Sequence, residues 1–298
     1  MDLKPGVYAQ ELRVTMTFSS VLGVASLLLL SGSVRSDHVV DPALLDIAEI
    51  HRLDEVIASS YLLRHSFLRC FEGGEFLNMT DAASVFALNH YVYSKNFIDY
   101  LRTVAAKIDS EEIKRPILEN INEEKGNYEA EDIDTLSSMG IAEEWYNRIP
   151  HKVLSQRFFE SLGIDPEDIP AIDGSAGGSL VETDDDGPGE LFTKFMLNLY
   201  GESNVCESLA VIGFAIEESV SRLYEFIWNG LRDHTPLTGD QIVFFPLHIL
   251  IDDGHADLLK LGFKHFVQNQ PALCGNVDDV IHNVLRYRLR GNTVHSLY

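Results

Sequence analysis

Positive charge is scarce in this chain of 298 residues. It holds 23 lysines and arginines against 46 aspartates and glutamates, which gives a formal net charge of -23. A surface this acidic repels the phosphates of DNA, RNA and anionic lipids. We therefore expect no nucleic-acid partner and no stable insertion into a membrane.

Cysteine is also scarce, with only Cys70, Cys206 and Cys274 in the whole chain. The number is odd and no two of them form a C-x-x-C pair, so neither a disulfide framework nor a thiolate zinc site is favoured. We expect three buried thiols and a reducing, cytoplasmic compartment.

Long apolar runs are almost missing, and the uncharged stretch 14–34 is the exception. It has the apolar character of a signal peptide or short anchor, but the charges before it are balanced and lack the usual positive bias. We expect residues 1–39 to be an apolar or flexible N-terminal extension, and residues 40–298 to be one domain. Export or anchoring through residues 14–34 is the alternative to a cytoplasmic location.

The chain also lacks the alternating apolar pattern of β-strands, and apolar residues recur with helical spacing almost throughout. An all-α helical bundle is therefore the expected fold class. Asp41 and Pro42 should cap and open its first helix. The expected helices span about 41–70, 80–106, 110–125, 141–162, 189–200, 205–231 and 238–268, with a last one before the C-terminus. Residues 127–140 and 174–189 should be irregular.

The seventh of these segments carries the sharpest chemical signal. His248, Asp252 and His255 are spaced i, i+4, i+7, which places them within roughly 60° of one another on a helix. Two imidazoles and a carboxylate on one helix face suit a divalent iron, manganese or zinc ion. A polar stripe with chance spacing is the competing interpretation.

A metal site in a bundle needs ligands from facing helices, and Glu123-Glu124 is one candidate pair. Glu124 shares a helix face with the apolar Ile117 and Ile121, where a carboxylate is costly unless a cation pairs with it. Glu123 shares the polar face with Glu119. We therefore predict that Glu124 is a ligand and that Glu123 faces solvent.

The same reasoning applies to Glu217-Glu218. Glu217 has Phe214, Val220 and Tyr224 at helical spacing, whereas Glu218 has Arg222 four residues on, as in an ordinary surface ion pair. We predict that Glu217 is a ligand and that Glu218 is exposed. Taken alone, His90 on an aromatic helix face is more often a hydrogen-bonded core residue than a ligand, and a histidine at a helix start, such as His151, is also commonly structural.

Together these motifs resemble the haem-oxygenase-like di-iron oxidase and oxygenase superfamily, whose fold is shared by thiaminase II and the pyrroloquinoline quinone synthase. The resemblance covers about residues 45–290 and implies a bundle of about seven helices. The matching segments are Asn89–Phe97, Asn120–Gly126, His151–Pro166, Ala215–Glu217 and His248–His255.

The resemblance implies two Fe²⁺ ions per chain. One would be held by His90, Glu124, His151 and His255, and the other by Glu124, Glu217, His248 and Asp252, with Glu124 bridging. The implied function is oxidation of a small, amino-acid-like or fatty-acid-like metabolite by O₂, in a biosynthetic pathway. The chemistry would take place at the metal centre, and no separate catalytic side chain is implied.

This sequence departs from the family pattern in two places. His90 stands where relatives usually have a glutamate, and the stretch between Glu124 and His151 is longer than usual, which makes Asp134 an alternative ligand. A metal-free enzyme like thiaminase II, a haem oxygenase with His51 or His65 as the haem ligand, and a non-catalytic binding protein are the rival functions. A homodimer is an open alternative to a monomer.

Overall fold

The computed structural model describes residues 40–128, 130–169, 172 and 186–292. The expected N-terminal extension, with its apolar stretch 14–34, lies outside the described residues, as does most of the expected loop 174–189. Within these ranges the chain forms helices and no strand, so the predicted all-α class is confirmed.

The helices are more numerous than the roughly seven expected, because short breaks divide several of them. In chain order the described α-helices are α1 (Ala48–Ala58), α2 (Ser66–Glu72), α3 (Met79–Ser94), α4 (Phe97–Ala105), α5 (Glu111–Glu124), α6 (Ala130–Ser138), α7 (His151–Ser161), α8 (Pro188–Glu202), α9 (Val205–Ala210), α10 (Ser219–His234), α11 (Gly239–Ile242), α12 (Phe244–Asn269) and α13 (Val277–Asn292). A π-helical segment, η5 (Val211–Glu218), joins α9 to α10 without a break.

Local capping explains where the first predicted helix divides. The Asp41 side chain accepts a hydrogen bond from the Ala43 backbone as predicted, but it caps only the short 3-10 turn Pro42–Leu45. Further on, the ring of His65 accepts from the Phe67 backbone and starts α2. A side-chain cap satisfies an amide that has no partner inside the helix, so each cap allows a new helix to begin.

The segment between α5 and α7 differs from the expectation. Residues 127–140 contain α6 rather than an irregular loop, and α7 begins at His151, ten residues later than predicted. Pro150 directly precedes α7 and disfavours helical backbone in the residue before it, which explains the late start. Gly126 after α5 has a φ of 87°, and a Cβ there would meet the backbone of Ile149.

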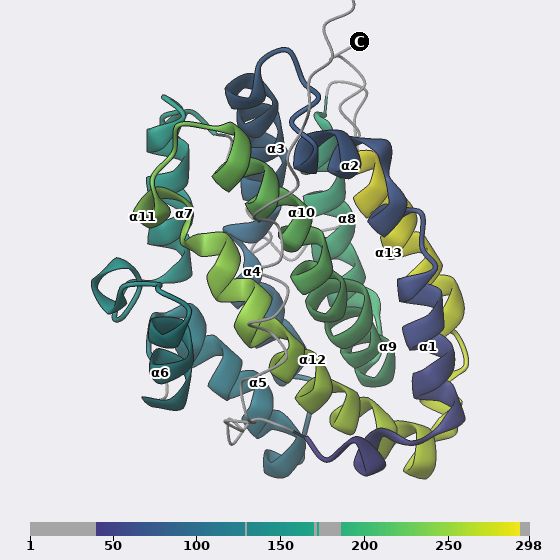
Figure 1. The fold of residues 1–298 in the computed structure, drawn as a ribbon. Coiled ribbons are helices and arrows are strands. Elements are labelled where there is room, and N and C mark those ends of the chain that lie inside the picture. The colour runs from purple at the N-terminus through teal and green to yellow at the C-terminus, as the bar shows by residue number, and fades with distance from the viewer. Residues whose placement is uncertain (1–39, 129, 170–171, 173–185, 293–298) are drawn as a thin grey trace, which may run out of the picture. The chain divides into compact units, whose positions relative to one another are not determined.

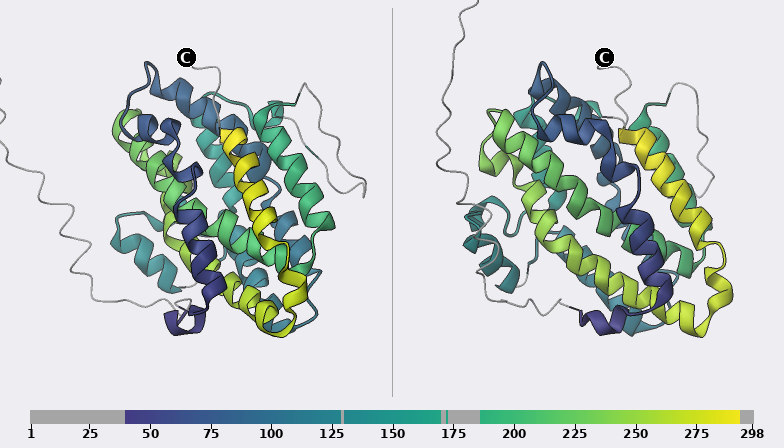
Figure 2. Two further views of the ribbon diagram at one scale, coloured as in Figure 1. Left: turned by 90° about the vertical axis from the view of Figure 1, so that its right-hand side faces the viewer. Right: turned by 45° about the vertical axis from the view of Figure 1, so that its right-hand side comes forward.

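The long helices pack around one apolar core. Helix α12 lies beside α10 and also contacts α5, α7 and η5 (Figure 1). Helix α13 lies along α8, which also contacts α3 (Figure 2). Five elements that contribute polar residues to the core, α5, α7, η5, α12 and α13, are thereby held around a common interior.

Within the described ranges, none of the helices combines the length and the apolarity that crossing a lipid bilayer requires.

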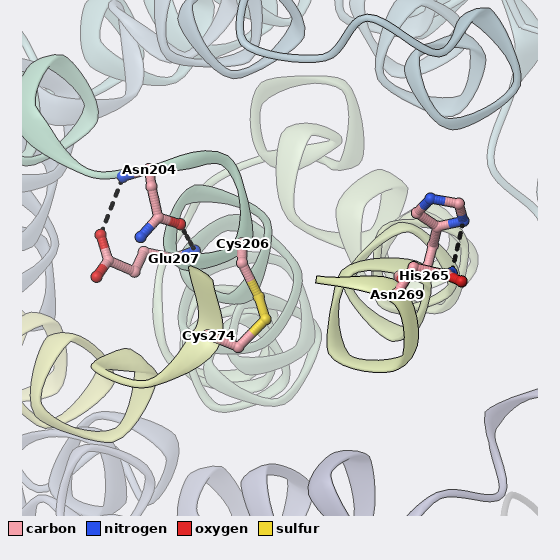
Figure 3. The surroundings of a disulfide bond; sticks show 6 residues. All are labelled: Asn204, Cys206, Glu207, His265, Asn269 and Cys274. Atoms are coloured by element: carbon pink, nitrogen blue, oxygen red, sulfur yellow. Dashed lines mark hydrogen bonds between the residues drawn. A yellow bond between two sulfur atoms is a disulfide. The ribbon is translucent and has the colours of Figure 1, made fainter. Parts of the chain in front are cut away.

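The expectation of three buried thiols was wrong. Cys206 in α9 and Cys274 in the 3-10 turn Pro271–Cys274 form a disulfide, although 68 positions separate them in sequence (Figure 3). The turn after α12 reverses the chain and carries Cys274 back to α9, a proximity that sequence spacing cannot reveal. The cysteines therefore no longer support a reducing compartment, and a cytoplasmic location stays a prediction.

We expect reduction of the Cys206–Cys274 bond to lower the free energy of unfolding by about 2–4 kcal/mol, because the open chain regains loop entropy. Denaturant unfolding with and without reductant, followed by circular dichroism, measures the change. The double variant Cys206→Ser/Cys274→Ser should behave like the reduced protein in both conditions. Cys70→Ser is the matched control and should keep its sensitivity to reductant. Equal unfolding midpoints with and without reductant would contradict the prediction.

Candidate metal centre

Six buried ionisable side chains converge in the interior from four helical elements. Glu124 ends α5, His151 begins α7, and Glu217 lies in η5. His248, Asp252 and His255 lie on successive turns of α12, as their spacing predicted. These six form two groups of three, and within each group the possible ligand atoms lie within 4.8 Å of one another.

The first group contains Glu124, His151 and His248. Glu124 Oε1 lies 3.0 Å from His151 Nδ1 and 3.9 Å from His248 Nε2. The two imidazole rings are close neighbours, with centroids 4.4 Å apart. One carboxylate and two imidazoles at this separation match the donors that divalent iron, manganese or zinc prefers.

The second group contains Glu217, Asp252 and His255. His255 Nδ1 lies 3.7 Å from Asp252 Oδ1, one turn earlier on α12. The like charge of Asp252 acts on Glu217 across the gap between η5 and α12. Two carboxylates and one imidazole make this group the more acidic of the two.

The histidines are grouped differently from the arrangement that the family resemblance implies. His248 was expected with Asp252, and His255 with His151, whereas the structure pairs His248 with His151 and His255 with Asp252. Seven residues of α-helix separate His248 from His255 by about 10 Å along the axis. Because α7 begins beside the first turns of α12, His151 meets the nearer histidine.

Hydrogen bonds from outside the two groups orient their histidines. His248 Nδ1 lies 2.6 Å from the carbonyl oxygen of Phe244, which can only accept, so Nδ1 carries the proton and Nε2 keeps its lone pair. His151 Nε2 lies 2.6 Å from the hydroxyl of Tyr128. Such partners fix the tautomer and ring orientation of a metal-binding histidine.

Glu123 provides the same support to the second group, and its predicted exposure was wrong. It is buried, and its Oε2 accepts from His255 Nε2 at 2.7 Å, which leaves His255 Nδ1 to face Asp252. Asn120, on the same supposedly polar face, is also buried and donates to Glu217 Oε1 at 2.7 Å. This face of α5 packs against α12, a contact that a single-helix pattern does not contain.

Glu218 was also predicted to be exposed, and it is buried. Its predicted neighbour Arg222 lies 3.7 Å away, but Glu218 also lies 3.2 Å from Lys260 of α12. Lys260 in turn pairs with Asp54 of α1 at 2.9 Å. Helix α1 packs over η5 and covers a face that the sequence pattern assigned to solvent.

The remaining candidates lie outside both groups. The ring of His90 stacks on Phe86, and its Nε2 forms a hydrogen bond with the hydroxyl of Tyr224 rather than meeting Glu124. Burial, and then the charge of Arg288, lowers the pKa of His90 to about 3. Asp134 is exposed on α6. The alternative haem ligands are also elsewhere, because His51 pairs with Asp46 at the surface and His65 caps α2.

Burial and mutual charge shift the pKa values of several of these six side chains. Burial, together with the like charge of Asp252, raises the pKa of Glu217 well above its usual range. Burial would also raise the pKa of Glu124, but the adjacent His151 and His248 outweigh it and lower the pKa. Burial lowers the pKa of His248 to about 4. Burial would also lower the pKa of His255, but the adjacent Glu123 and Asp252 outweigh it and raise that pKa well above its usual range. Buried carboxylates and imidazoles without counter-ions from outside are a costly arrangement that divalent cations would relieve.

Donors without partners indicate that metal ions fit here. The buried side-chain atoms without a hydrogen-bond partner among the described residues include His151 Nδ1, which faces Glu124 of its own group, and Asp252 Oδ2. Both belong to the two groups, and both can donate a lone pair to a cation. Native structures leave few buried polar atoms unsatisfied, and such exceptions are typical of functional sites.

A cavity reaches the metal groups. Glu124, His151, Glu217, His248 and Asp252 form part of its wall. The rest is mainly apolar or aromatic and includes Phe97, Ile98, Val220 and Phe244. A small organic molecule can therefore lie directly beside the candidate ligands.

Comparison with known proteins supports this picture. Residues 84–286 match the model of a family described as iron-containing redox enzymes. Six chains of solved structures match, and one is a domain of unknown function with a haem oxygenase-like fold from Shewanella denitrificans. That match has 16% sequence identity and a TM-score of 0.52, and covers 85% of this chain and 91% of the other. No protein of curated function matches this chain.

We expect Glu123→Ala to weaken binding of a divalent cation by about 10–100-fold, because His255 loses the partner that orients it. Calorimetric titration of metal-free protein with Mn²⁺ or, without oxygen, Fe²⁺ gives the affinity. Glu119→Ala, on an outer face of the same helix, is the control and should bind as the unmodified chain does. Unchanged affinity in a folded Glu123→Ala protein would show that this carboxylate is dispensable.

His90→Ala should keep every metal-binding step of the unmodified protein, since all six converging donors remain and the His90 ring is engaged with Tyr224. Anaerobic titration of metal-free protein with Fe²⁺ shows whether His90 is a core residue or a ligand. If His90→Ala removes one step and leaves another, His90 is a ligand, as the family resemblance implies.

Proposed function

This chain belongs to the family of iron-containing redox enzymes, and from that membership we propose that it is a non-haem di-iron oxidase or oxygenase, which uses O₂ to oxidise a small metabolite. The observation that carries the proposal is the pair of buried groups, each with three possible ligands, that share α12. A single metal would need only one of them.

We propose that Glu124, His151 and His248 hold one iron, and that Glu217, Asp252 and His255 hold the other. Ferrous ions with open coordination positions would supply the electrons that reduce O₂. The protein supplies the ligands, their orientation and a shielded cavity. Glu124 is the proposed bridge, because it contacts both histidines of its own group and its pKa also responds to His255 of the other.

The charges of the surrounding carboxylates match those of two divalent metal ions. Glu124, Glu217, Asp252 and the supporting Glu123 contribute four negative charges when ionised, and two ferrous ions contribute four positive charges. Loading would thus neutralise buried carboxylates that otherwise repel one another. Proton release should accompany binding, because Glu217 holds a proton more readily than an exposed glutamate does.

The cavity supports a small organic substrate. It is lined mainly by apolar and aromatic side chains with a few charged and polar groups among them, which is the usual make-up of small-molecule sites. An amino-acid-like or fatty-acid-like metabolite, a role in a biosynthetic pathway and a homodimeric state stay predictions.

Protein supplied with iron during expression should contain about two irons per chain, as measured by elemental analysis. His248→Ala, Asp252→Ala and Glu217→Ala should each lower the iron content and abolish O₂ consumption with the fold retained, because each removes a buried donor. His265→Ala is the matched control, an exposed histidine on the same helix, and should change neither quantity. Normal iron loading in His248→Ala would refute the assignment of α12, and haem absorbance or absence of metal would favour a rival function.

A further inference from the structure

Arg288 of α13 is a buried cation without a carboxylate partner among the described residues. Its side chain is 5% exposed, and the hydrogen bonds it makes all come from Nη1, to the Ala215 carbonyl at 2.7 Å, the Ser219 hydroxyl at 2.6 Å and the Ile216 carbonyl at 3.5 Å. These are neutral acceptors, so they do not balance the charge. Arginine keeps its proton even when buried, and a buried charge is costly unless an anion pairs with it.

Two tyrosine hydroxyls without partners among the described residues lie within reach of the charge of this guanidinium. Tyr93 and Tyr200 are buried, and neither hydroxyl has a hydrogen-bond partner among the described residues. Tyr93 lines the same cavity as Arg288, and the charge of Arg288 acts on both rings. Burial raises the pKa of both hydroxyls, so they remain protonated and able to donate. A guanidinium and two phenols together form a donor-rich cluster that lacks an acceptor.

This cluster opens onto the cavity of the metal centre. Arg288 and Tyr93 line the same wall as Glu217 and His248. Glu217 is a carboxylate that acts electrostatically on Arg288, but no ion pair joins the two among the described residues.

The rest of the cavity indicates what else the anion carries. Phe97, Ile98 and Val220 offer apolar surface in the same space, which an inorganic anion would leave unfilled. Lys95 is half-buried and Lys152 exposed, and both line the cavity where it meets solvent. In a chain with a net charge of -23, two cations at this point would favour entry of an anion.

We propose that Arg288 and Tyr93 form a binding site for the carboxylate of an organic acid, whose apolar part occupies the cavity beside the metal groups. This assignment names the substrate class of the proposed oxidase and in that respect rests on the proposed function. The binding site itself consists of residues outside both metal groups, so it can be tested on protein without metal.

The experiment is calorimetric titration of the metal-free full chain with hexanoate, with hexanamide as the uncharged analogue and inorganic phosphate as the anion without a tail. Hexanoate should bind at least about ten-fold more tightly than hexanamide, because hydrogen bonds to a charged group are the stronger ones. It should also bind more tightly than phosphate. Equal binding of hexanoate and hexanamide, or tighter binding of phosphate, would overturn the proposal.

Tyr93→Phe is the decisive variant, because it removes only a hydroxyl that has no hydrogen-bond partner in the described part of the chain. It should weaken hexanoate binding by about ten-fold. The thermal midpoint without ligand should stay the same or rise, since a buried unsatisfied group is lost. Tyr91→Phe is the matched control. Tyr91 lines the same cavity, but its hydroxyl already accepts from Gln156 at 3.2 Å, so hexanoate binding should not change.

Arg288→Gln should abolish measurable hexanoate binding, whereas Arg286→Gln, an exposed arginine on the same helix, should leave it intact. If Arg288→Gln fails to fold because η5 loses its hydrogen bonds, Tyr93→Phe still decides. Unchanged hexanoate affinity in Tyr93→Phe would refute the site. If the protein takes up iron but does not bind hexanoate, the carboxylate site is refuted and the proposed function is not. If it binds hexanoate but takes up no iron, the proposed function is refuted and the carboxylate site is not.

Discussion

The cost of burying charge is the constraint on which the rest of this structure depends. Three carboxylates and three imidazoles of the two metal groups lie in an apolar helical core, where each isolated charge would be strongly disfavoured. Hydrogen bonds from the surrounding residues offset part of that cost. Asn120, Glu123, Tyr128 and the Phe244 carbonyl each engage one atom of a group member and leave another atom facing inward. The inward atoms are the ones that cations would satisfy.

The same constraint explains how much of the site could be predicted from the sequence. The i, i+4, i+7 spacing on α12 and the apolar neighbours of Glu124 and Glu217 indicated buried polar groups, and these residues do converge. A pattern within one helix reports only its own apolar face, however. It could not indicate that α12 covers the other face of α5 or that α1 covers Glu218, so Glu123 and Glu218 were misplaced.

Predictions that depended on long-range proximity fared worst. Cys206 and Cys274 are joined because a turn reverses the chain between them, and no spacing rule expresses that. The all-α class, in contrast, follows from a periodicity present in nearly every segment, and it was predicted correctly even though the helices are divided more often than expected. Local order could thus be predicted from the sequence, whereas the contacts between helices that arrange the site could not.

The π-helical segment η5 has a consequence for the register of the rod formed by α9, η5 and α10. A π-turn places one more residue between hydrogen-bonded groups than an α-turn does, so the parts of the rod before and after η5 are out of phase with each other. The same residues wound as a regular α-helix would rotate everything beyond η5 by about 100° relative to α9. Glu217 and Tyr224 could not then both face the cavity while Cys206 kept its place. The π-helical winding of this segment is therefore as strict a requirement as the identity of any ligand, and it is one that an inspection of side chains alone would overlook.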